Sequence, residues 1–100
     1  MVKHIILWQL NEALTDGQRA EVKEGIKEGL EGLLGKIPGL SEIRVYTQGL
    51  PSSSADVMLY SVFESPEALQ GYSVHPDHVT VADSKVRPFT KTRLCLDFED

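Results

Sequence analysis

The sequence predicts an α+β protein in which a four-stranded antiparallel sheet carries its helices on one side, with the ferredoxin-like element order βαββαβ. Four stretches alternate apolar and polar residues, further stretches have helical spacing with recognisable start signals, and glycine, proline and serine separate them. One hundred residues, 41% of them hydrophobic and 25% charged, suffice for one core and are too few for two. We therefore expect a single domain over residues 1–100.

The first strand is expected over residues 2–10, which are rich in β-branched and aromatic types. One face would carry Val2, His4, Ile6, Trp8 and Leu10. The opposite face would carry Ile5 and Leu7, so we expect this strand to be buried on both faces.

A long amphipathic helix is expected next, from Thr15 to about Lys36. Thr15 and Gln18 have the spacing of a capping box, which marks the start of the helix. Pro38 and Gly39 then stop it. Its apolar face follows spacings of three and four residues through Val22, Ile26, Leu30, Leu33 and Ile37.

Three glycines, Gly25, Gly29 and Gly32, fall together beside this apolar face, although each glycine inside a helix costs about 1 kcal/mol relative to alanine. Three explanations stay open. The helix tolerates them, it packs closely on the sheet at this edge, or the edge leaves space for a ligand.

The remaining strands follow from alternation. Residues 40–48 and 55–63 alternate apolar and polar side chains, and the run Gly-Leu-Pro-Ser-Ser-Ser at 49–54 is a loop between them. Residues 89–98 form the last strand in this prediction. These three stretches complete the sheet.

Two short helices are expected between the third and fourth strands. Ser-Pro-Glu at 65–67 supplies a capping serine and a proline at the first helical position, and the helix that follows carries Tyr72. A second start at His-Pro-Asp, residues 75–77, leads to Val86. Pro88 ends this second helix.

The sheet face away from the helices predicts a partner. Five apolar side chains would leave that face bare in a single chain, and large bare apolar patches usually mark interaction surfaces. We therefore expect a twofold homodimer whose two sheets pack face to face. The five residues are Ile5, Leu7, Leu94, Leu96 and Phe98.

Composition excludes several classes of function. A formal net charge of −5 disfavours nucleic acid as a partner. No stretch approaches the ~20 apolar residues of a membrane span, and the N-terminal stretch lacks the pattern of a signal peptide, so we expect no membrane association. Cys95 is the only cysteine, which excludes an intrachain disulfide and favours a reducing, cytoplasmic location.

The histidines limit the chemistry. His75 and His78 have a spacing that two metal ligands could have, but no third ligand is defined, so we expect neither a metal nor a cofactor. An alternative is that His75 caps a helix and His78 is an ordinary half-buried imidazole. Cys95 lies in a strand without a basic histidine beside it in sequence, which favours a packed thiol over a nucleophile.

General acid–base catalysis is the remaining alternative, and His78, Tyr72 and Asp97 could supply its imidazole, hydrogen-bond donor and orienting carboxylate. Asp97 interrupts an apolar strand, so it needs a partner when buried, and a histidine is a natural one. Arg93 lies on the same strand face and could present a cation to an anionic or enolate ligand. Alternatively, Arg93 extends to solvent from the strand end.

Five segments, taken in order, resemble the stress-responsive A/B barrel (Dabb) family. The resemblance covers nearly the whole chain and implies a ferredoxin-like protomer whose sheet pairs with that of a second copy in a dimeric α+β barrel. Many members have no assigned activity. The segments are Val-Lys-His-Ile-Ile-Leu at 2–7, Ile-Pro-Gly-Leu at 37–40, Phe-Glu-Ser at 63–65, residues 72–78 with His-Pro-Asp-His at their end, and Leu-Asp-Phe-Glu at 96–99.

One plant branch of that family comprises polyketide cyclases that close a linear poly-β-ketone without a cofactor. The resemblance implies an acid–base pair of Tyr72 and His78, with Asp97 supporting His78 and His4 nearby. The chain departs from this branch where Val57 replaces a histidine and where aromatic pocket residues give way to Ile26 and glycines. We expect a pocket between helices and sheet that is lined by His4, Ile6, Trp8, Ile26, Val57, Leu59, His75, Val79 and Arg93.

The sequence is therefore compatible with three functions. The first is a homodimer that binds a small hydrophobic or aromatic molecule, with His/Tyr acid–base chemistry of the polyketide cyclase type. The second is a non-catalytic oligomer in a stress response. The third is a cofactor-free monooxygenase, because related dimeric α+β barrels include such enzymes.

Overall fold

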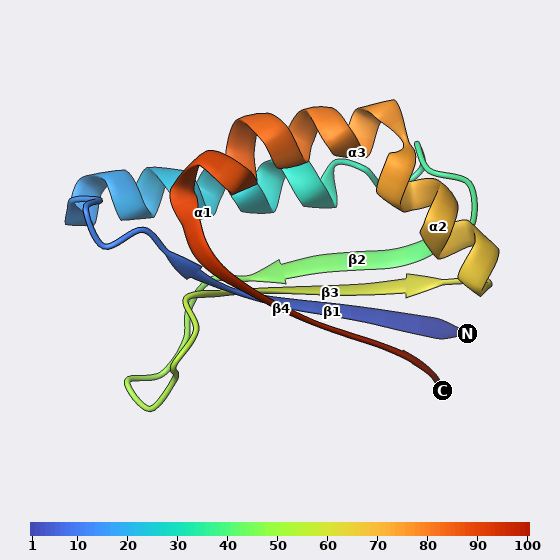
Figure 1. The fold of residues 1–100 in the computed structure, drawn as a ribbon, viewed down its shortest axis with the longest axis horizontal. Coiled ribbons are helices and arrows are strands. Elements are labelled where there is room, and N and C mark those ends of the chain that lie inside the picture. Colours follow the sequence, from blue (N-terminus) through green and yellow to red (C-terminus); the bar gives the residue numbers. More distant parts are fainter.

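Four antiparallel strands form one sheet in the order β2-β3-β1-β4 in the computed structural model, which describes all of residues 1–100 (Figure 1). All helices cover one face of this sheet and leave the other face bare (Figure 1). The predicted ferredoxin-like α+β fold is thus confirmed. In chain order the elements are β1 (Val2–Leu10), α1 (Asp16–Glu31), β2 (Leu40–Tyr46), β3 (Val57–Phe63), α2 (Pro66–Val74), α3 (Pro76–Val81) and β4 (Thr90–Glu99).

Strand β1 lies between β3 and β4 and provides the middle of the core. Val2, Ile6 and Leu10 are buried under the helices, as the alternation predicts. Ile5 and Leu7 on the other face are only half-buried in the single chain, so burial on both faces is not achieved by one copy. The core itself is continuous from the inner face of the sheet to the apolar face of α1.

Helix α1 begins as predicted and ends earlier than predicted. The Thr15 side chain accepts a hydrogen bond from the Gln18 amide, and the Gln18 side chain accepts one from the Thr15 amide, which completes the capping box. The helix ends at Glu31, with Gly32 as its C-cap, and not near Lys36. Turns follow, and within them Gly35 adopts a φ of 87°, a left-handed conformation that glycine accepts without strain.

The glycine edge of α1 faces residues 81–85, at the end of α3 and just after it, and not the sheet. A Cβ atom on Gly29 would lie 2.8 Å from Val81 Cγ1, closer than carbon atoms approach in proteins. One turn earlier, a Cβ on Gly25 would lie 3.7 Å from Lys85 Cδ, an ordinary contact. Close packing of α1 on α3 therefore explains why a glycine occupies position 29. Gly32 is the C-cap of α1 and so lies outside the helix proper.

The helices after β3 start where their caps predict. Ser65 Oγ accepts a hydrogen bond from the Ala68 amide at 3.1 Å, and His75 Nδ1 accepts one from the Asp77 amide at 3.1 Å. The stretch after α3 differs from the predicted helix, because residues Ala82–Val86 form a π-helical segment and Arg87–Phe89 a turn of 3₁₀-helix before β4 begins.

Strands β2 and β3 are shorter than predicted, so the loop between them spans residues 47–56 and projects below the sheet, away from the helices (Figure 1). Asp56 anchors its second end, since one carboxylate oxygen accepts from the Leu10 amide at 2.8 Å and the other from Arg19 at 2.9 Å. No helix is long and apolar enough to cross a lipid bilayer.

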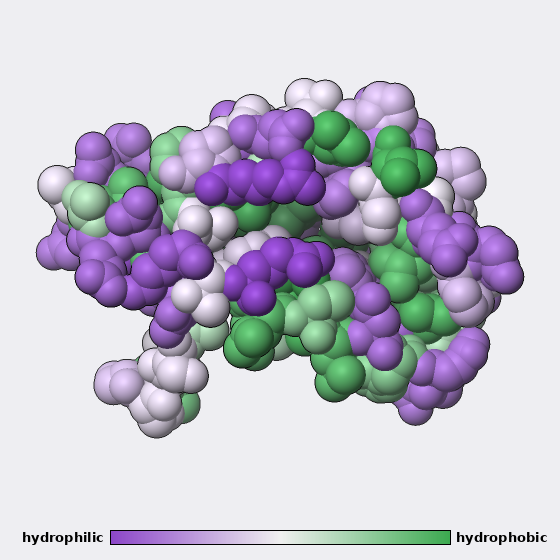
Figure 2. All heavy atoms as spheres, viewed as in Figure 1, coloured by the Kyte–Doolittle hydropathy of each residue, from purple (hydrophilic) through white to green (hydrophobic).

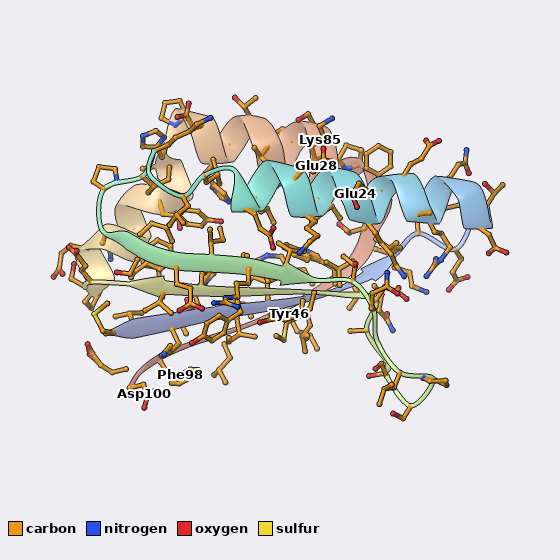
Figure 3. All side chains as sticks on the ribbon, turned by 180° about the vertical axis from the view of Figure 1, so that it is seen from behind. Glu24, Glu28, Tyr46, Lys85, Phe98 and Asp100 are labelled. Carbon is orange, nitrogen blue, oxygen red and sulfur yellow. The ribbon has the colours of Figure 1, made fainter.

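The bare face of the sheet is apolar, as predicted. Leu94 and Leu96 are each 63% exposed and Phe98 is 41% exposed, and in the register of β1 with β4 they stand opposite Leu7, Ile5 and Lys3. Apolar side chains gather along this lower side in Figure 2. Phe98 and Tyr46 point away from the helices in Figure 3. We call Ile5, Leu7, Leu94, Leu96 and Phe98 the outer apolar face.

Candidate active site

A cavity of about 110 Å³ lies between the sheet, α1 and the helical stretch 66–89. Seven of the predicted site residues surround it, namely His4, Ile6, Trp8, Leu59, Tyr72, His78 and Arg93. The strands supply His4, Leu59 and Arg93 through the alternation of side chains, whereas α2 and α3 supply Tyr72 and His78. The predicted position of the pocket, between helices and sheet, is therefore where the structure has a cavity.

Four residues predicted to line the pocket do not reach this cavity. Ile26 and Val57 are buried in the apolar core, where neighbouring side chains surround them. His75 is occupied as the N-cap of α3, as the alternative interpretation of that residue had it. Val79 is half-buried in the second half of α3 and contributes nothing to the cavity wall.

The cavity also has walls that the sequence did not indicate. Ala82 and Val86 reach it from the π-helical segment, and Arg87 from the turn that follows. A π-turn rotates the residues after it relative to an α-helix, so helical spacing alone places their side chains wrongly. The remaining additional lining residues are Leu30, Ser73 and Thr90.

Tyr72 is the most deeply buried polar side chain of the cavity. It is 2% exposed, and its ring lies 5.0 Å from the Phe63 ring and 4.1 Å from the His78 imidazole, centre to centre. Its hydroxyl has no hydrogen-bond partner within the protein. Burial raises the pKa of Tyr72 well above its ordinary value although the charge of Arg93 opposes this, so the hydroxyl is a neutral donor near pH 7.

His78 is held in one tautomer by the backbone. Its Nδ1 lies 3.3 Å from the Ser73 carbonyl oxygen, and because a carbonyl only accepts, Nδ1 carries the proton and Nε2 a lone pair in the neutral ring. Burial lowers the pKa of His78, and the charges of Arg87, His4 and Arg93 lower it further, whereas the bond to Ser73 opposes them. The neutral imidazole, which is the form of a general base, is therefore favoured.

Asp97 contacts a different histidine from the one predicted. Its Oδ1 accepts a hydrogen bond from His4 Nδ1 at 2.5 Å, and no bond joins it to His78. The register explains this, because Asp97 stands directly opposite His4 in the pairing of β4 with β1. Asp97 therefore orients His4, and His78 is oriented by Ser73.

Cys95 is exposed, which corrects the expectation of a packed thiol. Its Sγ donates to Asp97 Oδ1 at 3.5 Å and lies 4.0 Å from His4 Nδ1. Partial burial and the neighbouring Asp97 carboxylate raise the pKa of the thiol, although Arg93 opposes this. A thiol with a raised pKa is a poor nucleophile, in agreement with the sequence interpretation.

Two arginines border the cavity, and they differ in their partners. Arg87 forms an ion pair with Asp83, four residues earlier. Arg93 stands opposite Trp8 on the edge strand β4 and makes no ion pair with an acidic side chain. Arg93 therefore offers an unneutralised cation at the exposed side of the cavity.

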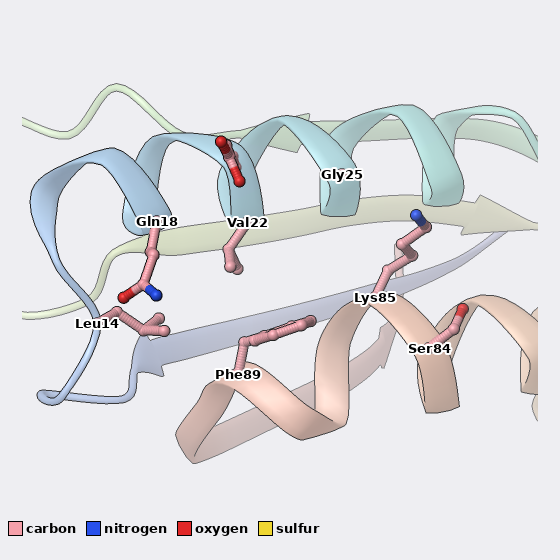
Figure 4. Close-up of a pocket in the computed structure, with 8 residues that line it drawn as sticks. Leu14, Gln18, Val22, Gly25, Ser84, Lys85 and Phe89 are labelled. Carbon is pink, nitrogen blue, oxygen red and sulfur yellow. The ribbon is translucent and has the colours of Figure 1, made fainter.

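A second hollow lies on the other side of the helical layer. This open groove of about 440 Å³ runs between α1 and residues 84–89, and Gly25 forms part of its α1 wall (Figure 4). Gln18 and Val22 point from α1 toward Phe89, and Lys85 faces them from the opposite wall (Figure 4). None of the predicted catalytic residues lines the groove.

The element order and the strand order define a ferredoxin-like α+β protein. The family model described as the stress-responsive A/B barrel domain (Dabb) matches residues 2–100, and the chain belongs to this family. The resemblance seen in the sequence is thereby confirmed.

The chain is similar to several proteins of known sequence or structure. The chain is 28% identical over 100 residues to olivetolic acid cyclase from Cannabis sativa, a match that covers 97% of this chain and 94% of that protein. A dimeric protein of unknown function with a ferredoxin-like fold from Bacteroides fragilis superposes with a TM-score of 0.92 and 29% identity, covering 99% and 95% of the two chains. The hydroxynitrile lyase of Passiflora edulis, at 17% identity and a TM-score of 0.72 over 97% and 90%, shares the fold.

Proposed function

We propose that the chain forms a homodimer whose cavity binds a small carbonyl compound and that His78 and Tyr72 transfer protons on it, the chemistry that an aldol ring closure of the polyketide cyclase type requires. The observation that carries the proposal is the buried Tyr72 hydroxyl, which has no partner in the protein and stacks beside a histidine kept neutral. A buried polar group without a partner costs stability, and a ligand in the cavity would supply the missing acceptor.

The roles follow from the protonation states. The Nε2 lone pair of neutral His78 would remove a proton from the carbon next to the carbonyl group. The Tyr72 hydroxyl would donate a hydrogen bond to the carbonyl oxygen, where negative charge develops. Arg93 would stabilise that charge from the open side, since no acid neutralises it.

The size of the cavity limits what enters it. Its 110 Å³ is smaller than the ~150 Å³ of an engineered cavity that binds benzene, and well below the ~300 Å³ of ordinary ligand pockets. The cavity therefore fits only the reacting end of a hydrophobic or aromatic ligand, and the rest would extend past Arg93. The 28% identity to olivetolic acid cyclase supports a carbonyl substrate of this kind.

The outer apolar face supports the proposal of a homodimer. Three of its side chains are between 41% and 63% exposed and adjoin the half-buried Ile5 and Leu7. Structures similar to this chain from Bacteroides fragilis and Thermobifida fusca are described as dimeric. Pairing two sheets across this face would bury the apolar surface that one layer of helices leaves bare.

Proton transfer can be tested with levulinate, whose ketone end is small and whose carboxylate suits Arg93. We expect the protein in D2O to accelerate deuterium exchange at the carbons beside the ketone, followed as loss of the methyl signal in NMR spectra. His78→Gln should remove the acceleration because it removes the base, and Tyr72→Phe should reduce it strongly. His75→Asn is the matched control, since His75 lies outside the cavity and asparagine retains a helix cap.

The opposite result has a clear meaning. If wild type and His78→Gln exchange levulinate at the same rate while both remain dimeric, the acid–base assignment is wrong. The non-catalytic oligomer would then be the better description of the protein.

A further inference from the structure

Three side chains that commonly bind metals converge where β1 meets β4, beside the cavity. The donor atoms of His4, Cys95 and Asp97 all lie within 4.8 Å of one another. Asp97 and Cys95 belong to the exposed edge strand, whereas His4 is buried and also borders the cavity. Imidazole, thiolate and carboxylate thus meet at a position with solvent on one side and the cavity on the other.

The sheet itself enforces this convergence. Antiparallel pairing places Asp97 directly opposite His4 and Cys95 opposite Ile6. Because side chains two residues apart on a strand point the same way, Cys95 and Asp97 share the face on which His4 lies. Backbone hydrogen bonds fix the three Cα positions, so only side-chain rotation remains free.

The separations are close to those of a tetrahedral zinc site. Bond lengths of about 2.0 Å to nitrogen and oxygen and about 2.3 Å to sulfur place neighbouring ligand atoms about 3.2–3.6 Å apart. Cys95 Sγ is 3.5 Å from Asp97 Oδ1 and 4.0 Å from His4 Nδ1. Only the 2.5 Å bond between His4 Nδ1 and Asp97 Oδ1 must open, and the Asp97 side chain, 43% exposed, is free to rotate.

The donor set selects the ion. A thiolate disfavours Mg²⁺ and Ca²⁺, which prefer oxygen ligands, whereas one nitrogen, one sulfur and one oxygen suit Zn²⁺ and its spectroscopic substitute Co²⁺. Three protein ligands with a fourth position left to water or substrate are the usual number at a catalytic zinc. The nearby charge of Arg93 opposes a cation, so binding should be weaker than at a closed structural site.

We propose that His4 Nδ1, Cys95 Sγ and an Asp97 carboxylate oxygen bind one Zn²⁺ per chain, with the fourth position open at the edge of the cavity. On binding, the Sγ proton leaves to solvent, and the proton on Nδ1 is replaced by the ion while Nε2 carries the ring proton, so His4 binds as a neutral imidazole. The site uses neither His78 nor Tyr72, so it stands apart from the proposed proton transfer.

The test is a titration of the protein with Co²⁺, followed by absorption spectroscopy. We expect one Co²⁺ per chain, the visible bands of tetrahedral cobalt, and a near-ultraviolet band from charge transfer between thiolate and metal. Cys95→Ser should abolish the charge-transfer band, and Asp97→Asn should raise the Kd at least tenfold. Both residues are exposed, so both variants should fold.

Two controls separate a built site from chance binding. His75→Asn removes a half-buried histidine that lies outside the cluster and should leave the titration unchanged. Arg93→Gln should tighten Co²⁺ binding because it removes an opposing charge. If Cys95→Ser and Asp97→Asn bind Co²⁺ with the wild-type Kd, or if wild type shows no charge-transfer band at saturation, the metal site is wrong, whatever the outcome with levulinate.

Discussion

Gly29→Ala tests whether the close approach of α1 and α3 determines stability. The added methyl carbon would lie 2.8 Å from Val81 Cγ1, about 0.7 Å inside the ~3.5 Å at which two carbon atoms attract each other best. Val81 cannot rotate away easily, because β-branched side chains in helices hold one χ1 rotamer. The two helices must therefore separate.

Two opposing effects set the magnitude. Alanine gains about 1 kcal/mol of helix propensity over glycine. Overpacking costs about 1–3 kcal/mol. We expect Gly29→Ala to be neutral or to lower the free energy of unfolding by up to about 2 kcal/mol, whereas Gly25→Ala, with its nearest contact at 3.7 Å, should raise it by about 1 kcal/mol.

Urea unfolding followed by circular dichroism measures both variants, at one fixed protein concentration because a dimer's stability depends on it. Adding Val81→Ala to Gly29→Ala should recover part of the lost stability, since it removes the clashing methyl. If Gly29→Ala stabilises the protein as much as Gly25→Ala does, the helices do not meet at this glycine and the packing argument fails.

Three further outcomes are expected. Leu96→Asp should place a carboxylate in the proposed dimer interface and convert the dimer to monomer in sedimentation at micromolar concentration, whereas Leu50→Asp, at a loop tip 74% exposed, should not. Tyr72→Phe should raise the free energy of unfolding by about 1 kcal/mol because it removes a buried hydroxyl without a partner, and a loss instead would mean that the hydroxyl is bonded. His78 should titrate by NMR below its ordinary 6.5, because burial lowers its pKa. Because the folded state resists protonation of His78, the free energy of unfolding is highest above pH 6.5 and decreases as the pH falls from 6.5 toward the folded-state pKa. His78→Gln should remove this pH dependence.

The sequence was most informative where one local signal decides the structure. The alternation of Ile6 and Leu10 with Ile5 and Leu7 predicted both faces of β1, and the capping box at Thr15 predicted the start of α1. These features depend on neighbours in sequence, so the composition of a short segment reveals them. The order of the elements and the fold followed from such features, whereas the expected location of the pocket came from the resemblance to the Dabb family.

Contacts between residues far apart in the sequence could not be predicted from short segments. Asp97 bonds to His4 because the register of β4 on β1 places them opposite each other, and nothing near Asp97 in sequence distinguishes His4 from His78. The end of α1 at Glu31 was not predicted because the apolar spacing of three and four residues continues past it through Leu33 and Ile37. The exposure of Cys95 reflects an edge strand that the helices do not cover.

The π-helical segment Ala82–Val86 is a single wall with a hollow on either side. Ala82 and Val86 line the cavity that contains Tyr72, while Ser84 and Lys85 line the open groove against α1. Because these residues form one turn, a displacement of the whole turn that widened one hollow would narrow the other. A molecule lodged in the groove would therefore change the volume open to a substrate, and by linkage the substrate would change the affinity of the groove by the same factor.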